Sequence, residues 1–377
     1  MAGPRHLTPC PPHVYVHVPF CARRCSYCDF SIAVRREVPV TRFIDAIQAE
    51  LVTRAVGPAV SGVGSIYFGG GTPSKLGPGI ADLTRLISTT AGVPATSVGE
   101  ITVEANPEDI TVGVVASWLD AGVNRVSLGV QTFDPSVLAW MHRTHTVEQV
   151  AEAVRILVGE GVENVSVDLI FALPESLGRD WRRDLDQAIQ LTPKHVSLYG
   201  LTVEPHTPLS RWADRGRLSG ASEERYEAEF LEADRVLGDA GFVHYEVSNY
   251  AQPGFEAQHN SAYWAEAEYL GLGLSAHGFD GETRRWNQRE YARWLERVEA
   301  GQDPMEGEET LWPAERGAER IYLGLRTVKG LRATEEEFAR AERWISEGWA
   351  RREGDRLVLT PLGWLRLDAL AGSLIAD

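Results

Sequence analysis

Short β-branched segments alternate with helical patterns through the first two-thirds of the chain, and this alternation limits its fold more than any other feature. Strands are predicted at residues 14–18, 66–68, 100–104, 125–128, 165–170 and 196–201. Helices are predicted between them at residues 41–55, 80–90, 112–120, 147–160 and 180–191. Successive strand-then-helix units imply a parallel sheet with right-handed crossovers. We therefore predict an α/β fold, an incomplete (β/α)6 TIM-like barrel, with an open doubly wound sheet as the alternative.

Composition narrows the classes of function. The 377 residues include 53 acidic and 37 basic side chains, which gives a formal charge of −16. This excess of negative charge argues against binding to nucleic acid or to anionic lipid, since both need a basic surface. Residues 1–12 lack the apolar core of a signal peptide, and no stretch approaches the ~18 apolar residues of a membrane span. We predict a cytoplasmic protein with no membrane span and no nucleic-acid partner.

The chain divides by composition and pattern into five segments. They are a proline-rich leader (1–13), the partial barrel (14–240), an extension rich in aromatic residues and glycine (241–300), an acidic linker (301–313) and a C-terminal domain (314–377). The last segment has two helical patterns, a short strand and a final helix that opens with Thr360 and Pro361. That order predicts a small winged-helix-like domain.

Three cysteines, Cys21, Cys25 and Cys28, lie in a loop directly after the first predicted strand. Thiolates at these spacings can wrap one face of a [4Fe–4S] cluster. Such a cluster has four irons, so three thiolates leave one iron open for an exchangeable ligand. The spacing alone also fits a structural zinc bound by these cysteines with His17 or Cys10. Cys10 otherwise stands apart in the leader, and we interpret it as a bystander.

The cysteine loop belongs to a series of strings that resembles the radical S-adenosylmethionine (SAM) superfamily. The hallmark of that superfamily is C-x3-C-x2-C after the first strand of a βα repeat. Further similar strings are FGGGTPS at 68–74, EANP at 104–107, RVSLGVQ at 125–131, VDLI at 167–170 and LYG at 198–200. Together they resemble the branch that holds oxygen-independent coproporphyrinogen III oxidases and HemW-type heme chaperones. The resemblance covers most of residues 14–280.

The resemblance implies a site where the open iron binds the amino and carboxylate groups of SAM. In a barrel, side chains at the carboxyl ends of the strands share one face. By resemblance, the SAM-binding residues are Tyr15, Tyr27, Gly70, Gly71, Thr72, Glu104, Gln131, Arg143 and Asp168. Glu104 would place a negative charge beside a positively charged ligand. Arg143 would bind the carboxylate as a forked donor, and Asp168 would accept from a ribose hydroxyl.

Two features distinguish the members of this branch. The oxidases carry a further cysteine two positions after the third, where this chain has Phe30, and a longer segment before the cluster than the 20 residues here. Residues 259–264 read HNSAYW and resemble the H-N-x-x-Y-W string of the heme chaperones. By that resemblance His259, Tyr263 and Trp264 contact heme, since imidazole is a common axial ligand and aromatic rings stack on porphyrin.

We therefore predict a heme chaperone that passes heme to an acceptor protein and uses a [4Fe–4S] cluster and SAM. The expected partners are the unidentified acceptor and an electron donor such as a flavodoxin or ferredoxin. The alternative is an oxygen-independent coproporphyrinogen III oxidase, and a radical SAM enzyme acting on another substrate is a third class. Whether the chain is an enzyme stays open at this point.

Overall fold

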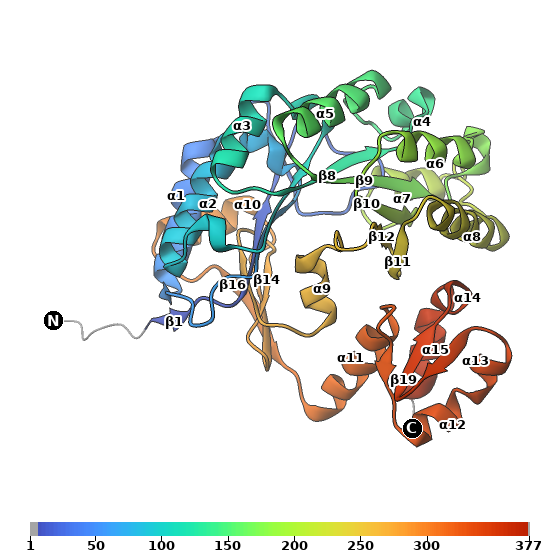
Figure 1. Ribbon diagram of the computed structural model, residues 1–377. Helices are drawn as coiled ribbons and strands as arrows, with labels where there is room; N and C mark the ends of the chain where they lie inside the picture. Colours follow the sequence, from blue (N-terminus) through green and yellow to red (C-terminus); the bar gives the residue numbers. More distant parts are fainter. Residues whose placement is uncertain (1–6, 376–377) are drawn as a thin grey trace. The chain divides into compact units, whose positions relative to one another are not determined.

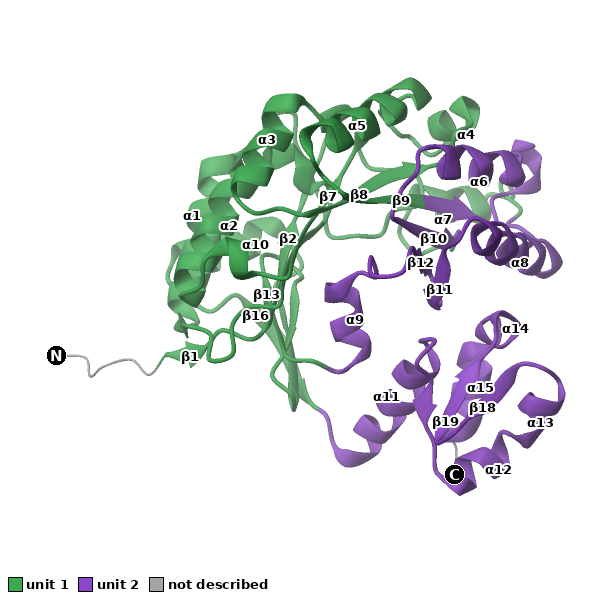
Figure 2. Ribbon diagram, viewed as in Figure 1, with its two compact units in different colours: residues 1–168, 202–219, 267–310 green, residues 169–201, 220–266, 311–377 purple. Residues whose placement is uncertain are grey.

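The computed structural model describes residues 7–375 and forms two compact units (Figure 2). Unit 1 comprises the chain up to residue 168 with residues 202–219 and 267–310, and unit 2 comprises residues 169–201, 220–266 and the chain from 311 onward. Residues 1–6 of the predicted leader and residues 376 and 377 of the predicted C-terminal domain lie outside the described residues. The predicted domain boundaries remain a prediction.

A row of parallel strands forms the centre of unit 1 (Figure 1). The hydrogen-bonded order is β13, β2, β6, β7 and β8, and each neighbouring pair is parallel. The bounds are β2 His13–Val18, β6 Ser65–Gly70, β7 Glu100–Ala105, β8 Arg125–Gln131 and β13 Tyr269–Leu272. The four strands predicted from residue 14 to residue 128 are confirmed, because their β-branched residues form a buried core.

Helices connect these strands, as the alternating pattern predicts. The crossover helices are α1 Val40–Thr53, α2 Gly79–Ala91, α3 Val112–Asp120 and α5 Val147–Glu160. The ends of helix α5 could be predicted from the sequence because they carry capping residues. Thr146 and Gln149 form a capping box, and Gly161 ends the helix with φ +104°. Two short helices that sequence reasoning did not predict are α4 Pro135–Trp140 and α7 Pro208–Asp214.

Short strands make up much of the stretch predicted to be irregular. Unit 1 adds β14 His277–Phe279, β15 Thr283–Asn287, helix α10 Tyr291–Glu299 and β16 Met305–Thr310. These three strands are antiparallel to their neighbours in the order β13, β14, β15, β16. The segment predicted as an acidic linker thus contains an edge strand. These three strands lack a β-branched run and contain charged residues and glycine, so the sequence gives them little strand signal.

A buried carboxylate fastens this antiparallel part to α1. Glu50 is fully buried and accepts hydrogen bonds from the Gly273 amide (2.9 Å), Asn287 Nδ2 (2.7 Å) and Trp294 Nε1 (3.0 Å). The Arg54 guanidinium lies 3.3 Å away. Burial raises the pKa of Glu50, and these donors offset part of that effect. The network holds the start of the 273–287 segment in place.

Four strands of two residues each form two further pairs in unit 1. Strand β1 Thr8–Pro9 pairs parallel with β5 Val56–Gly57, and β3 Phe20–Cys21 pairs parallel with β4 Ala33–Val34. The fifth predicted strand corresponds to β9 Asn164–Phe171. It begins in unit 1, and its residues from Leu169 onward belong to unit 2.

Unit 2 contains the remaining strands and the C-terminal segment. Its first part comprises α6 Trp181–Gln190, β10 His195–Gly200, α8 Glu223–Asp239, β11 Val243–Glu246, β12 Asn249–Ala251 and α9 Gln258–Trp264. Strand β12 pairs antiparallel with both β10 and β11. The C-terminal part comprises α11 Pro313–Leu325, β17 Leu331–Arg332, α12 Glu335–Arg340, α13 Glu342–Ser346, β18 Ala350–Glu353, β19 Arg356–Leu359, α14 Pro361–Trp364 and α15 Leu367–Ile375. The winged-helix-like order is present, with a small antiparallel sheet as the wing.

Candidate cofactor site and predicted heme motif

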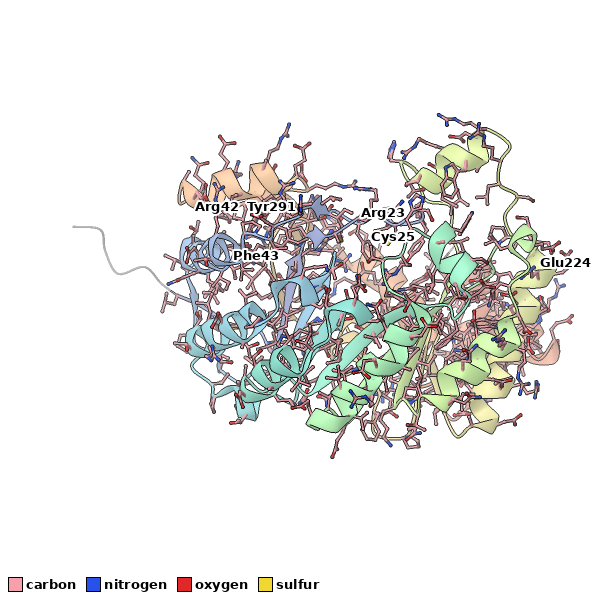
Figure 3. The ribbon with its side chains drawn as sticks, turned by 90° about the horizontal axis from the view of Figure 1, so that it is seen from above. Arg23, Cys25, Arg42, Phe43, Glu224 and Tyr291 are labelled. Carbon is pink, nitrogen blue, oxygen red and sulfur yellow. The ribbon has the colours of Figure 1, made fainter. Side chains whose placement is uncertain are left out.

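The pairing of β3 with β4 closes the cysteine loop at its base. The Cys21 carbonyl accepts from the Arg35 amide (3.0 Å) just beyond this pair. Next to Cys21, Phe20 is fully buried and its ring packs edge-on at 5.4 Å against both Phe43 and Tyr291. Figure 3 shows Phe43 and Tyr291 on one side of the loop that carries Cys25. The cysteine loop therefore begins at a paired strand whose Phe20 side chain is packed among aromatic rings.

The three cysteines differ in exposure. Cys21 is buried, and its Sγ lies 3.3 Å from Thr72 Oγ1, whereas Cys25 and Cys28 are partly exposed. Burial raises the pKa of Cys28 to about 11 and also raises the pKa of Cys21, and Cys25 raises both further. A bound metal supplies the positive charge that a group of thiolates needs.

A structural zinc is the alternative that the cysteine spacing leaves open, with His17 or Cys10 as a further ligand. Within residues 7–375, no three His, Cys, Asp or Glu side chains are grouped so that they could hold a metal ion. A zinc ion needs its ligands to converge on one point, whereas a [4Fe–4S] cluster takes each thiolate on a separate iron. His17 Nε2 already bonds the Ser31 carbonyl (2.9 Å), and its Nδ1 lies 3.3 Å from Tyr15 Oη. Cys10 is buried, which raises its pKa to about 11.

The glycine run at the end of β6, which continues to Gly71, packs directly against the cysteine loop and β2. Gly70 has φ +110°, and a Cβ there would lie 2.7 Å from the His17 ring. A Cβ on Gly71 would lie 2.6 Å from the Pro19 carbonyl oxygen and 3.0 Å from Cys21 Sγ. The lack of side chains thus has a packing reason in addition to the predicted contact with SAM.

Glu104 is held at the carboxyl end of β7 by two donors. Its Oε1 accepts from Tyr67 Oη (2.8 Å), and its Oε2 accepts from the Gly70 amide (3.1 Å). The Tyr67 ring stacks on Tyr15, with centroids 6.1 Å apart. Burial raises the pKa of Glu104 to about 7, and the negative charge of Asp168 adds to the effect. Sequence reasoning missed Tyr67, although it lies opposite Tyr15 in the β2–β6 register.

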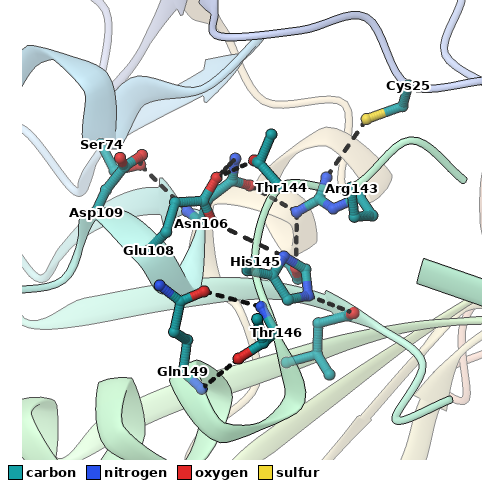
Figure 4. A network of polar contacts seen from close by, with 12 residues as sticks. Cys25, Ser74, Asn106, Glu108, Asp109, Arg143, Thr144, His145, Thr146 and Gln149 are labelled. Carbon is teal, nitrogen blue, oxygen red and sulfur yellow. Dashed lines mark hydrogen bonds and ion pairs between the residues drawn. The ribbon is translucent and has the colours of Figure 1, made fainter. Parts of the chain in front are cut away.

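Arg143 joins three elements near the cysteine loop (Figure 4). Its NH2 donates to Asn106 Oδ1 (2.7 Å) and to the Gly129 carbonyl (2.8 Å), and its NH1 lies 3.6 Å from Cys25 Sγ. Its Nε is buried without a hydrogen-bond partner in the described part of the chain. The guanidinium therefore keeps donor capacity for an anionic ligand. Asn106 was missed as a site residue, although the EANP string contains it.

The other predicted SAM residues also lie in unit 1, with one difference in position. Asp168 is predicted at the end of a strand but lies within β9, where it accepts from Ser127 Oγ at 2.9 and 3.1 Å. Gln131 is the buried last residue of β8 and has φ +70°. Tyr27 is partly buried beside Arg143, and burial raises its pKa. Whether these side chains bind SAM remains a prediction.

The predicted heme residues lie on the short helix α9 of unit 2. His259 is 1% exposed, and its Nε2 lies 2.8 Å from Tyr263 Oη. The Trp264 ring has the Arg326 guanidinium above it at 4.3 Å, and its Nε1 is buried without a hydrogen-bond partner among the described residues. Arg326 also pairs with Glu246 at 3.2 Å. His259 and Trp264 of the predicted heme motif therefore contact other side chains of unit 2.

Comparisons with known proteins agree with this arrangement. The family described as the radical SAM superfamily matches residues 15–188. The heme chaperone HemW of Mycobacterium tuberculosis is 37% identical over 368 residues, which cover 96% of this chain and 94% of that protein. HemW of Escherichia coli is 36% identical over 269 residues, covering 71% and 70%. The chain belongs to the HemW family of the radical SAM superfamily.

A solved structure confirms the predicted fold class of this HemW family member. The structure of coproporphyrinogen III oxidase (HemN) from Escherichia coli, a radical SAM enzyme, matches with a TM-score of 0.80. It covers 98% of this chain and 91% of that chain at 20% sequence identity. A similarity at this identity shows the fold alone. Among residues 7–375, no helix is both long and apolar enough to cross a membrane.

Proposed function

We propose that this protein is a heme chaperone, which binds heme and passes it to an acceptor protein. The observation that carries the proposal is the 37% identity to a heme chaperone along nearly the whole chain. Phe30 supports the proposal, because it occupies the position where the oxidases of this branch carry a further cysteine. Its side chain is 57% exposed. The fold similarity to the oxidase does not favour the oxidase reaction, since one fold hosts many chemistries.

Cys21, Cys25 and Cys28 would hold a [4Fe–4S] cluster in this protein. When bound, such a cluster supplies one-electron chemistry and an iron position for an exchangeable ligand. The closed base of the loop and the contact between Cys21 and Thr72 support this assignment. Arg143 would help to position Cys25, since its NH1 lies 3.6 Å from Cys25 Sγ.

The SAM site would use the polar groups around the glycine run. Glu104 would bind the ammonium group, and Tyr67 and the Gly70 amide orient its carboxylate. Arg143 would bind the carboxylate of SAM with the donors that Asn106 and Gly129 leave available. Asp168 would accept from a ribose hydroxyl. Gly71, Thr72, Gln131, Tyr15 and Tyr27 would complete the surroundings.

Heme is the cargo of the proposed chaperone, and the H-N-x-x-Y-W motif is its predicted contact. His259 can serve as an axial ligand through Nε2 only after its bond to Tyr263 opens. Heme transfer also needs an acceptor protein. The cluster needs a one-electron donor of the flavodoxin or ferredoxin class. The cytoplasmic location remains a prediction.

One parallel assay tests the function. The cluster is reconstituted anaerobically in the wild type and in Cys25→Ser, and each protein is titrated with heme and incubated with coproporphyrinogen III and SAM. We expect saturable heme binding and no consumption of coproporphyrinogen. Consumption that depends on Cys25 would overturn the chaperone in favour of the oxidase. Cleavage of SAM without any heme binding would instead indicate an enzyme with another substrate.

A further inference from the structure

Two tryptophans and a histidine form a partly exposed group in unit 1. We call Trp140, His142 and Trp212 the α4–α7 aromatic patch, because they come from the end of α4, the turn after it, and α7. The Trp140 and Trp212 ring centroids are 5.8 Å apart, and those of His142 and Trp212 are 5.7 Å apart. All three side chains are partly exposed, and the His142 ring makes no hydrogen bond among the described residues.

The backbone fixes this group beside the cysteine loop. The Met141 carbonyl accepts from the Ser26 amide (3.0 Å), and the Ser26 carbonyl accepts from the Leu209 amide at the start of α7 (2.9 Å). Between these ties, His142 has φ +62°, at a helix end where glycine is the common residue. A histidine in this costly conformation is typical of a functional position.

Three arginines lie in the same segment as Trp212, on α7 and just after it, and Arg211 NH1 lies 3.5 Å from the His206 carbonyl. Arg211, Arg215 and Arg217 are exposed, and none has an ion pair among the described residues. Gly216, with φ +65°, turns the chain back so that the Arg217 amide donates to the Trp212 carbonyl (2.9 Å). The chain as a whole carries a charge of −16. Arginines without an ion pair in the same segment as a partly exposed indole therefore suit a flat ligand that bears carboxylates.

We propose that the α4–α7 aromatic patch binds heme, with His142 as the axial ligand. The proposal rests on the proposed heme chaperone function. The His142 and Trp212 rings are nearly perpendicular, at 81°. An axial imidazole stands perpendicular to the porphyrin plane, so the 81° angle allows a porphyrin ligated by His142 to lie parallel to the Trp212 indole and stack on it. The three exposed arginines of the same segment would then pair with the propionates.

Other histidines in the described chain are less suited to this role: His13 Nδ1 lies 2.8 Å from Ser65 Oγ, and His206, although exposed and with φ +65°, makes no ring contact among the described residues. His17, His145, His195, His244 and His259 are largely buried, and each has at least one ring nitrogen in a hydrogen bond. His277 is exposed but lies flat on Trp286, at 27°. The arginines near it, Arg284 and Arg285, already pair with Glu309 and Asp303. His277 therefore serves as a matched control.

The test is a heme titration of the full-length protein, followed by the Soret absorbance and by the electron paramagnetic resonance of the ferric complex. The variants are His142→Gly, His259→Ala and the control His277→Ala. Glycine removes the imidazole and suits a positive φ, so a folded variant is expected. We expect His142→Gly to weaken heme binding by about tenfold or more and to change the axial-ligand spectrum. His277→Ala should match the wild type.

The arginines are tested with heme and its dimethyl ester, which lacks carboxylates. Replacing Arg211, Arg215 and Arg217 together by Gln should weaken binding of heme by about tenfold and leave binding of the ester unchanged. Wild-type affinity and spectrum in His142→Gly, or their loss in His259→Ala alone, would overturn this site while leaving the chaperone function intact. A wild type that binds no heme would overturn both.

Discussion

Glu104 gives the sharpest prediction about the proposed SAM site, because burial raises its pKa to about 7. The ammonium group of SAM needs the ionised carboxylate. With this pKa, about 9% of the carboxyl groups are ionised at pH 6.0 and about 50% at pH 7.0. The affinity for SAM should therefore rise about fivefold over this interval, which corresponds to about 1 kcal/mol. An α-amino group remains protonated in this range, with a pKa of about 7.7 to 8.0.

The measurement is isothermal titration of the reconstituted protein with SAM at pH 6.0, 6.5 and 7.0. Glu104→Gln preserves the shape of the side chain and can still accept from Tyr67. It should bind SAM more weakly, with little change between these pH values. An affinity that is flat in the wild type, or that has the same slope in Glu104→Gln, would refute the reasoning.

A change in folding stability cannot imitate this pH dependence. The folded-state pKa of Glu104 lies above the value of 4.5 expected for the unfolded chain. The protonated form therefore favours the fold, and the contribution of Glu104 to stability falls as the pH rises through the interval from 4.5 to about 7. Tighter binding at pH 7.0 thus opposes the trend in stability. Urea unfolding of the wild type and Glu104→Gln at each pH checks the sign.

The remaining predictions concern packing and the cysteine loop. Glu50→Ala should lower the free energy of unfolding by about 3 to 5 kcal/mol in urea titrations, since it leaves three buried donors unpaired. Gly71→Ala should reduce the iron bound per chain after reconstitution, because the added Cβ meets Cys21. Arg143→Lys should bind SAM at least about tenfold more weakly in titrations, since an ammonium cannot replace the fork. His142→Gly should raise the unfolding free energy by about 1 kcal/mol, because it relieves a positive φ.

The repeated part of the fold was predictable because its signals are local. Thr146 and Gly161 mark the ends of α5, and β-branched residues mark the buried parallel strands. The short antiparallel strands after residue 268 were missed, since their stability comes from pairing and from the buried Glu50 network. A glutamate on a helix gives no sign in the sequence that it will bond a residue more than 220 positions away.

The site was predictable where family strings exist and was missed where contacts cross strands. The cysteines and Glu104 follow from those strings. Tyr67 orients Glu104 across two strands, and its role depends on register. The α4–α7 aromatic patch joins Trp140 to Trp212, which lie 72 residues apart on helices too short to show a pattern. No local signal predicts such a meeting.

The tight turn after α4 points three consecutive residues in three directions. The Met141 carbonyl holds the Ser26 amide of the cysteine loop, the His142 ring meets Trp212, and the Arg143 guanidinium reaches Cys25. A helix would place consecutive side chains about 100° apart on one cylinder, and the positive φ of His142 removes that restriction. Under the two proposals above, one turn therefore supports the cysteine loop and supplies the heme ligand. In a heme chaperone, such a turn would connect the cluster loop directly to the bound heme.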